Sequence, residues 1–426
     1  MTDQTEQPNE QDVSKSRKPS RRRLWGTLAL VLLPILGLLW VSNWFYQRSR
    51  LFSVTNIDLE LGEPELPWGL LIGENKAREL FGDPIKYHLS EKTLTPYQIG
   101  ILGGYTGLRS LELRGVTDAD VRNLKGLTNL EGLALSDSPI TDKACEIIGQ
   151  FENLQRLFLG NFSSDSTTVQ ITDDGLKHLG HLKNLQTLGL GDYYTDSTVQ
   201  ITDDGLRHLV GLTQLRNLGL HSPRVTDDGF KTISQLQSLE SLLLDGRSLS
   251  GEDLSDLPNL PNLQNLHISN WSLKEHALSG LPKLGYLSQL SLWHCSLSEN
   301  CLRPIGDCPL LERFSLEGSR LSENLSLQPL AECPFLIRLF LNETNATDAM
   351  LEDLTSCRSL EGLYLNHTQV SHEACERFHR SHPGIFMTDA TGYEVGENNP
   401  TDASSGSDDP DKSEDTPVGN AQEDQL

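Results

Sequence analysis

The stretch VQITDDGLKHLGHLKNLQTLGL, residues 169–190, recurs thirty residues further on as VQITDDGLRHLVGLTQLRNLGL, residues 199–220. A unit repeated at a fixed period is typical of repeat proteins, in which each unit buries its apolar side only against its neighbours. The leucines of LQTLGL alternate with period two, so Leu188 and Leu190 share one face, as on a short strand. The leucines of DDGLRHLVGL recur every three residues, as on one face of a helical turn. The stretch therefore predicts a solenoid built from strand, link and helix.

Further copies of the L-x-x-L-x-L pattern extend the repeat in both directions. Eleven units begin at Leu108, Leu130, Leu154, Leu185, Leu215, Leu239, Leu263, Leu287, Leu311, Leu336 and Leu360. Most units are 24 residues apart, and the other spacings are 22, 31, 30 and 25. The two long units carry their extra residues in the links NFSSDSTTVQ and DYYTDSTVQ. Aromatic residues in these links, Phe162, Tyr193 and Tyr194, predict a protruding lip, although duplication of one unit explains the likeness equally well.

Units such as LQTLGL…VQITDDGLRHL and LEGLYLNHTQVSHEACERF resemble the leucine-rich repeat family. The likeness is closest to its variety of roughly 24 residues, which is common in bacterial surface proteins and related to the cysteine-containing repeats of F-box adaptors, and it covers residues 108–387. It implies an α/β solenoid: a right-handed horseshoe with a concave parallel β-sheet and helices or 3₁₀ turns outside. Many members place Asn after the strand, where its side chain joins adjacent links in a ladder. Pro223, Arg247 and Trp271 occupy that position in units five to seven, so we expect no uniform ladder there.

Residues 24–46, LWGTLALVLLPILGLLWVSNWFY, contain no charged side chain and are long enough to cross a bilayer core of about 30 Å. We therefore predict one transmembrane helix there, with the lipid bilayer as a partner. A cleaved signal peptide is the alternative, but no A-x-A cleavage motif precedes the polar stretch that follows. Basic side chains gather in residues 1–23, so the positive-inside bias predicts a cytoplasmic N-terminus and a periplasmic or extracellular repeat domain.

Two further segments flank the repeats. Residues 47–107 are interpreted as a juxtamembrane segment followed by an N-terminal capping unit, because solenoids need atypical end units to cover an open core. Residues 388–426 carry eleven acidic side chains against Lys412 alone and offer little to bury. We expect this acidic tail to be disordered.

The charge and cysteine patterns limit the possible ligands. The net charge of −24 argues against nucleic acid as a partner, because nucleic-acid binding needs a clustered basic face. Seven cysteines are an odd number and suggest no disulfide framework. Cys308, Cys333 and Cys357 replace leucine at one repeat position and are expected to be small buried residues. No CxxC or paired-His motif accompanies them, so neither a metal nor another cofactor is predicted.

The motif ITDDG occurs twice and is followed by VTDDG at residues 225–229. Stacked aspartates can hold calcium, which favours several oxygen ligands. The preferred interpretation is structural: the threonine caps the helix, and aspartates in the first turn complement the helix dipole.

The strand residues between the leucines should face the groove on the concave side. The larger of these side chains, together with one arginine, are the predicted ligand-binding residues: Phe158, His221, Leu243, His267, Trp293, Arg313, Phe340 and Tyr364. Small residues such as Gly132, Ala134, Gly189 and Gly219 face the groove in the earlier units. Partly exposed aromatic residues are favoured anchors in interfaces, although single exposed aromatics are also normal on protein surfaces.

These patterns predict a membrane-anchored protein that binds a protein or peptide, or scaffolds the cell envelope, through its concave face. The alternative is an intracellular F-box-like adaptor that recruits substrates to a ligase, but no F-box-like helical segment precedes the repeats. No nucleophile motif or glycine-rich phosphate loop is present, so we predict that the chain has no catalytic residues.

Overall fold

The computed structural model describes residues 86–87, 94–104, 106–160, 169–191, 199–252 and 259–395. The chain divides into two units, and every described residue belongs to the second, which comprises Leu61–Tyr87 and Glu91–Leu426.

Several sequence predictions concern residues outside these ranges. They are the membrane span at 24–46, the part of the predicted acidic tail 388–426 that follows residue 395, and the lip residues Phe162, Tyr193 and Tyr194. In the part of the chain that is described, no helix has both the length and the apolar character needed to cross a membrane.

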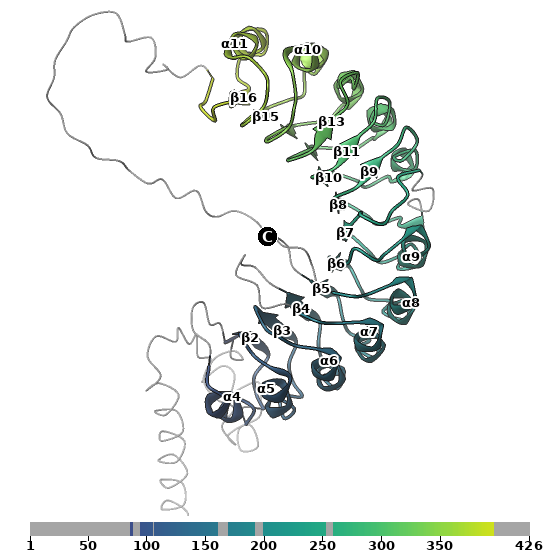
Figure 1. The fold of residues 1–426 in the computed structure, drawn as a ribbon, viewed down its shortest axis with the longest axis vertical. Helices are drawn as coiled ribbons and strands as arrows, with labels where there is room; N and C mark the ends of the chain where they lie inside the picture. The colour runs from purple at the N-terminus through teal and green to yellow at the C-terminus, as the bar shows by residue number, and fades with distance from the viewer. Residues whose placement is uncertain are drawn as a thin grey trace, which may run out of the picture. The chain divides into compact units, whose positions relative to one another are not determined.

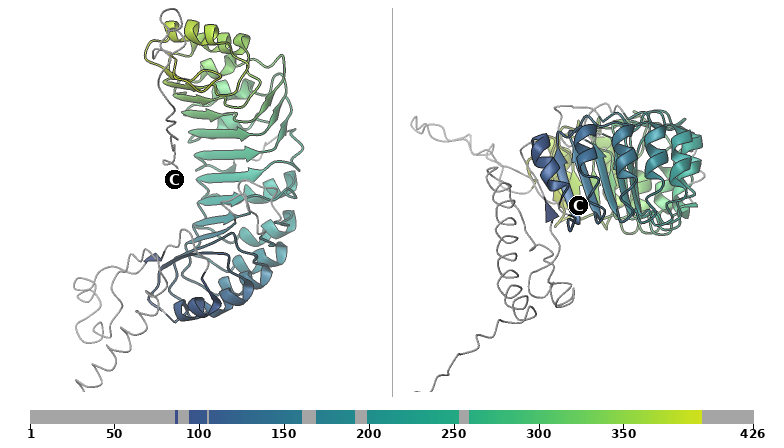
Figure 2. Two further views of the ribbon diagram at one scale, coloured as in Figure 1. Left: turned by 60° about the vertical axis from the view of Figure 1, so that its left-hand side comes forward. Right: turned by 90° about the horizontal axis from the view of Figure 1, so that it is seen from below.

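A parallel sheet of 13 strands runs through the described repeats, and its strand order follows the order of the chain (Figures 1 and 2). Equivalent positions pair from unit to unit, as Leu188 does with Leu218. The strands are β1 (Lys86–Tyr87), β2 (Ser110–Arg114), β3 (Gly132–Ser136), β4 (Arg156–Gly160), β5 (Thr187–Leu190), β6 (Asn217–Leu220), β7 (Ser241–Asp245), β8 (Asn265–Ser269), β10 (Gln289–Trp293), β12 (Arg313–Ser315), β14 (Arg338–Phe340), β15 (Gly362–Tyr364) and β16 (Phe386–Met387). The predicted α/β solenoid with a long parallel sheet is confirmed.

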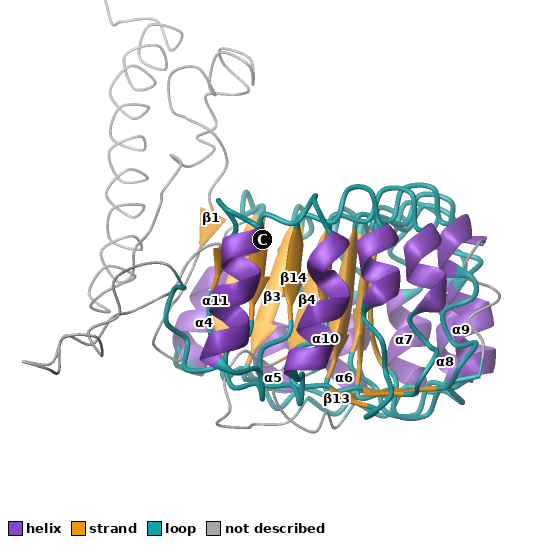
Figure 3. Ribbon diagram, turned by 90° about the horizontal axis from the view of Figure 1, so that it is seen from above, coloured by secondary structure: helices purple, strands orange, loops and turns teal. Residues whose placement is uncertain are grey.

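Helices form a layer outside the strands (Figures 1 and 3). They are α4 (Pro96–Leu102), α5 (Asp118–Asn123), α6 (Asp142–Ile148), α7 (Asp173–Leu179), α8 (Asp203–Leu206) with η1 (Arg207–Leu209), α9 (Asp227–Ile233), α10 (Asp348–Asp353) with η6 (Leu354–Ser356), and α11 (His372–Ser381).

Units seven to nine differ from the other units whose outer segments the structure describes in full. Their outer segments are 3₁₀ helices, each with proline in the first turn: η3 (Leu281–Lys283), η4 (Arg303–Asp307) and η5 (Gln328–Glu332). The same units contribute a second parallel sheet of short strands: β9 (Ser272–Leu273), β11 (Ser296–Leu297) and β13 (Arg320–Leu321). The Thr-Asp motif that starts α5 to α10 is missing from these units, and their prolines stand in the first turn, where a backbone N–H has no partner within the helix.

The core is a continuous stack of leucines between the two layers. Leu185, Leu188 and Leu190 of one unit lie beside Leu215, Leu218 and Leu220 of the next, and all are at most 2% exposed. Burying one leucine side chain contributes roughly 1.5–3 kcal/mol, so each unit depends on the one stacked against it.

The cysteines belong to this core. All seven are free thiols and buried, as predicted for Cys308, Cys333 and Cys357. Burial raises the pKa of the Cys308 and Cys333 thiols to about 12, because the thiolate would lose its hydration. These thiols are therefore protonated and unreactive at neutral pH.

The TDDG motifs join neighbouring units. The backbone N–H of Thr202 donates to Asp173 Oδ1 at 2.8 Å, and the Thr202 hydroxyl donates to Asp173 Oδ2 at 2.7 Å. We call this pair of bonds the Thr–Asp clasp. The same clasp joins Thr141 to Asp118, Thr172 to Asp142, Thr226 to Asp203 and Ser371 to Asp348. A Cβ on Gly205 would lie 2.1 Å from Asp173 Oδ1, so the aspartate occupies space that the glycine leaves open.

The predicted helix caps are confirmed at the TDDG motifs. Thr172, Thr202 and Thr226 each accept a hydrogen bond from the backbone N–H two residues later, at 3.3 Å. Thr347 also precedes a helix, but its side chain makes no capping bond. The sequence predicted only a helix-dipole role for the aspartate after the threonine. Its carboxylate also accepts two hydrogen bonds from the threonine of the following unit.

The side-chain ladder after the strands is interrupted where the sequence predicts. Ser319 Oγ accepts from the backbone N–H of Cys295 at 2.9 Å, as the ladder requires. In unit five the slot position is Pro223, and the residue before it, Ser222, is buried instead. The Ser222 hydroxyl donates to the Ile201 carbonyl at 2.7 Å. In unit seven Trp271 fills the slot with its indole and is 1% exposed.

The C-terminal end of the sheet is closed by a turn. β16 pairs with β15, and the described chain continues past Met387 to Val395. Asp389 is buried and accepts hydrogen bonds from the Thr391 hydroxyl at 2.6 Å and from His372 Nδ1 at 3.0 Å. These bonds hold the turn against α11.

Candidate functional site: the concave face of the sheet

The residues between the buried leucines point away from the core. In β4, for example, Leu157 and Leu159 are buried, whereas Arg156 is exposed and Phe158 is half-buried. Every predicted ligand-binding side chain has this placement: Arg313 is exposed, and Phe158, His221, Leu243, His267, Trp293, Phe340 and Tyr364 are half-buried. The structure distributes them over three clusters along the sheet.

The first cluster lies at the C-terminal end of the sheet. The rings of Phe340 and Tyr364 stack with centroids 4.5 Å apart and planes at 7°. Phe386, which the sequence prediction missed, extends the row, with its ring centroid 5.5 Å from that of Tyr364 and 41% of the residue exposed. Beside them, Arg313 and Arg338 are paired across β12 and β14, so two exposed guanidinium groups flank the aromatic row.

The second cluster lies at the middle of the sheet. His267 and Trp293 meet edge to face, with centroids 4.3 Å apart and planes at 89°. Trp293 Nε1 donates to Ser315 Oγ at 3.0 Å, and this bond fixes the orientation of the indole. The ring of Trp293 is therefore held in place while it remains half-buried.

His221 and His267 are neutral at physiological pH. Burial lowers the pKa of His267 to about 3, and the neighbouring imidazoles of His221 and His294 lower it further. Burial also lowers the pKa of His221 to about 4, although the Asp245 carboxylate opposes this effect. Asp245 is itself bound to Arg247 Nε at 2.9 Å. The middle of the concave face thus offers neutral, largely apolar imidazole rings to a ligand.

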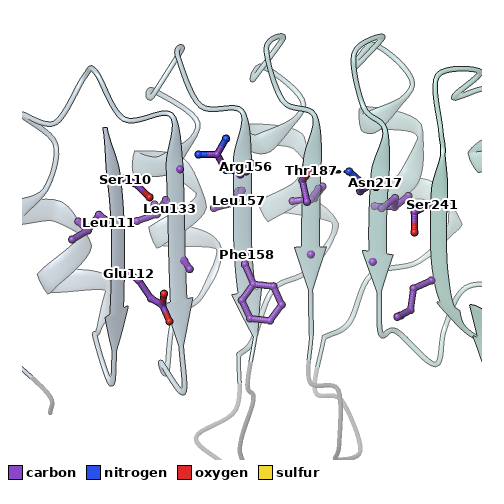
Figure 4. A pocket seen from close by; sticks show the side chains of 17 residues that line it. Ser110, Leu111, Glu112, Leu133, Arg156, Leu157, Phe158, Thr187, Asn217 and Ser241 are labelled. Atoms are coloured by element: carbon purple, nitrogen blue, oxygen red, sulfur yellow. Dashed lines mark hydrogen bonds between the residues drawn. The ribbon is translucent and has the colours of Figure 1, made fainter. Parts of the chain in front are cut away.

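The third cluster lines a hollow over β2–β7 with a volume of about 360 Å³. Figure 4 shows it as two rows of side chains: Ser110, Arg156, Thr187, Asn217 and Ser241 in one, and Glu112 and Phe158 in the other. The second row continues through Gly189 and Gly219 to Leu243. We call this hollow the glycine groove.

Glycines give the groove its depth. A Cβ on Gly189 would lie 2.7 Å from Phe158 Cδ2, so the ring of Phe158 leans over β5 only because that strand has no side chain there. The small residues on this part of the face were recognised from the sequence, but the position of the Phe158 ring depends on the register of β4 against β5.

The aspartate motifs lie at the helix starts, away from these clusters. The carboxylates of Asp142, Asp173 and Asp203 accept the clasp bonds described above, which supports the structural interpretation of TDDG. Within the described ranges, no group of three or more His, Cys, Asp or Glu side chains is placed to hold a metal ion.

Comparison with protein-family models found no match, and comparison with curated proteins found none. Among solved structures, the chain is similar to an internalin from Listeria monocytogenes, with 22% identity over 70% of this chain and 89% of that chain and a TM-score of 0.39. It is also similar to a leucine-rich repeat protein from Leptospira interrogans, with 20% identity, coverage of 74% and 98%, and a TM-score of 0.33. The leucine-rich repeat ectodomain of an Arabidopsis thaliana receptor kinase, GASSHO1/SCHENGEN3, matches at 16% identity, with coverage of 70% and 39% and a TM-score of 0.36.

Proposed function

We propose that this chain is a recognition protein whose concave face binds a protein or a peptide, or holds a partner in a cell-envelope scaffold. The observation that carries the proposal is the set of half-buried aromatic side chains on one continuous sheet face: Trp293, Phe340 and Tyr364, with Phe386 beside them. Exposed aromatic rings are costly in water and are the commonest anchors of interfaces.

The sheet also suits recognition because its side chains are already ordered. Trp293 is held by Ser315, and Phe340 is stacked on Tyr364. A partner that binds these rings loses little additional conformational entropy on the side of this protein, so more of the contact energy contributes to affinity. We propose binding rather than catalysis as the role of the chain, because His221 and His267 present neutral imidazoles in the middle of the concave face and Asp245 there is paired with Arg247.

The proposal is tested by removing the aromatic anchors. Replacing Trp293, Phe340 and Tyr364 by alanine in the full-length chain should abolish retention of the proteins that mass spectrometry identifies on the wild-type chain. The urea unfolding midpoint should change little, because the three side chains are only half-buried. The control is a Tyr286→Ala, Phe335→Ala variant, which removes aromatic side chains that are 61% and 53% exposed and lie outside the strands. Retention that survives the triple substitution, or is lost equally in the control, would exclude the aromatic row as the binding surface.

We further propose that residues 24–46 anchor the chain in a membrane and that the repeats lie on the periplasmic or extracellular side. The support is the uncharged sequence of that segment and the basic residues that precede it. Protease added to intact cells should therefore digest the repeats, whereas a repeat domain protected until the cells are lysed would favour the intracellular adaptor.

A further inference from the structure

The glycine groove contains a notch above β6. Phe158, Gly189, Gly219 and Leu243 are paired across the neighbouring strands β4 to β7 and form one row. The Phe158 ring covers the first of the two glycines. A Cβ on Gly219 would meet only the Cα of Gly189 within 4 Å, at 3.8 Å, so the space above Gly219 is open. The notch is thus bounded by an aromatic ring on one side and by Leu243 on the other.

The width of the notch fits one large side chain. Strands in a sheet are about 4.8 Å apart, so the backbones of β4 and β7 are separated by about 14 Å. The Phe158 ring takes the space above β5, and the remaining gap above β6 has apolar walls and a backbone floor. A leucine, methionine or aromatic side chain fills such a gap, whereas a charged group would be desolvated there without a partner.

A polar row runs alongside the notch (Figure 4). Thr187, Asn217 and Ser241 place one hydrogen-bonding side chain on each strand, and Asn217 Nδ2 donates to Thr187 Oγ1 at 3.1 Å. A row of polar groups at regular strand spacing suits the repeated N–H and C=O groups of an extended peptide.

Arg156 gives this row a charge preference. Its side chain is exposed, and its Nη2 lies 3.2 Å from the position that a Cβ on Gly132 would take. It forms no ion pair with another described residue, and the nearest carboxylate in the groove, Glu112, lies on β2, two strands away. A guanidinium in this position favours a carboxylate ligand. Arg156 is in register with Asn217, two strands away, and Gly219 lies two residues further along β6, so Arg156 and Gly219 are separated by about 12 Å. An extended peptide advances about 3.3 Å per residue, so the carboxylate belongs three or four residues from the apolar side chain in the ligand.

We infer that the glycine groove is a specificity pocket for an extended peptide in which a large apolar residue lies three or four residues from an aspartate or glutamate. The apolar side chain enters the notch above Gly219, and the carboxylate pairs with Arg156. This inference rests on the proposed function, since it takes the concave face as the recognition surface, and it adds the chemistry of the ligand.

The test is to pan a displayed library of random dodecapeptides on the full-length chain. The wild-type chain should enrich sequences that place Leu, Met, Phe or Trp three or four residues from Asp or Glu. Enriched peptides, remade synthetically, should bind a Gly219→Val variant at least tenfold more weakly, because the valine side chain fills the notch. They should bind Arg156→Gln several-fold more weakly and with less dependence on salt, because the charge pair is lost.

Two controls separate binding from folding. Valine is favoured in strands and Gly219 has open space, so Gly219→Val should keep the wild-type unfolding midpoint. Ser291→Val makes the same kind of change in the same row on β10, outside the groove, and should leave peptide binding unchanged.

The outcomes distinguish this inference from the proposed function. Enriched peptides without the acidic–apolar pattern, equal binding to Gly219→Val, or a library with no enrichment would overturn the inference. Peptides that are lost on the Trp293, Phe340 and Tyr364 alanine variant but retained by Gly219→Val would overturn it while supporting the proposed function. Peptides insensitive to both sets of substitutions would count against both.

Discussion

Trp271→Ala is expected to lower the free energy of unfolding by about 3–5 kcal/mol, which is the usual cost of removing a fully buried aromatic ring. Trp271 is 1% exposed and occupies the slot after its strand that other units fill with serine or threonine. The preceding unit packs closely against the tryptophan: a Cβ on Gly246 would lie 2.7 Å from Trp271 Cβ and 3.0 Å from Trp271 Cγ. Urea unfolding followed by circular dichroism measures the effect.

Trp271→Phe is the matched variant. The indole Nε1 is buried and has no hydrogen-bond partner among the described residues. Phenylalanine removes that unsatisfied donor and leaves a smaller void, so the two effects partly offset each other and the loss should be about 1 kcal/mol. If Trp271→Ala costs less than about 1 kcal/mol, the indole does not support the stacking of units six and seven as described.

Asp203→Ala is expected to destabilise the fold by about 2–3 kcal/mol, because hydrogen bonds to a charged acceptor contribute about 1.5–3 kcal/mol and one freed donor is a backbone N–H. Asp203 accepts from the Thr226 N–H at 2.9 Å and from the Thr226 hydroxyl at 2.6 Å. A Cβ on Gly229 would lie 2.2 Å from Asp203 Oδ1, so the carboxylate is pressed against the next unit. The measurement is again the urea unfolding midpoint.

The adjacent aspartate supplies the control. Asp204 is next to Asp203 in the same motif, but its side chain is 74% exposed and pairs with Arg207 one turn further along the helix. Exposed pairs of this kind contribute at most about 0.5 kcal/mol, so Asp204→Ala should be close to neutral. Equal losses in the two variants would show that the motif acts through helix-dipole charge and not through the clasp.

The leucine positions were predictable because the residues that alternate along each strand are the same residues that pack against the next unit. Leu188 and Leu218 had to point inward for either unit to bury an apolar side, and they pair across β5 and β6. The interruption of the ladder was also predictable, because Pro223 and Trp271 lack the small polar side chain that the slot requires.

The Thr–Asp clasp could not be predicted in the same way. Sequence shows that Asp173 follows the capping Thr172, but it does not show that the carboxylate reaches Thr202 in the next unit. That contact depends on the distance between stacked helices. The reason for the glycine in TDDG could not be predicted either, because the space beside it is occupied by the aspartate of another unit.

The concave face was predictable as a surface but not as separate clusters. Alternation placed Phe158, Trp293 and Tyr364 on the concave side of the strands, facing away from the core, where the structure has them. It did not place the Phe158 ring over Gly189, because that contact depends on neighbouring strands. Phe386 was missed because the final strand lacks the leucine pattern that identifies the facing positions.

The Thr–Asp clasp has a consequence for how such a protein grows. Units two to four each carry both halves of the joint: the threonine bonds to the preceding unit, and the aspartate accepts from the following unit, as Thr202 and Asp203 do. An additional copy inserted between two such units therefore meets complementary partners at both ends without any compensating mutation. The array is accordingly open to lengthening by unequal recombination, and a designer could extend it with the same module.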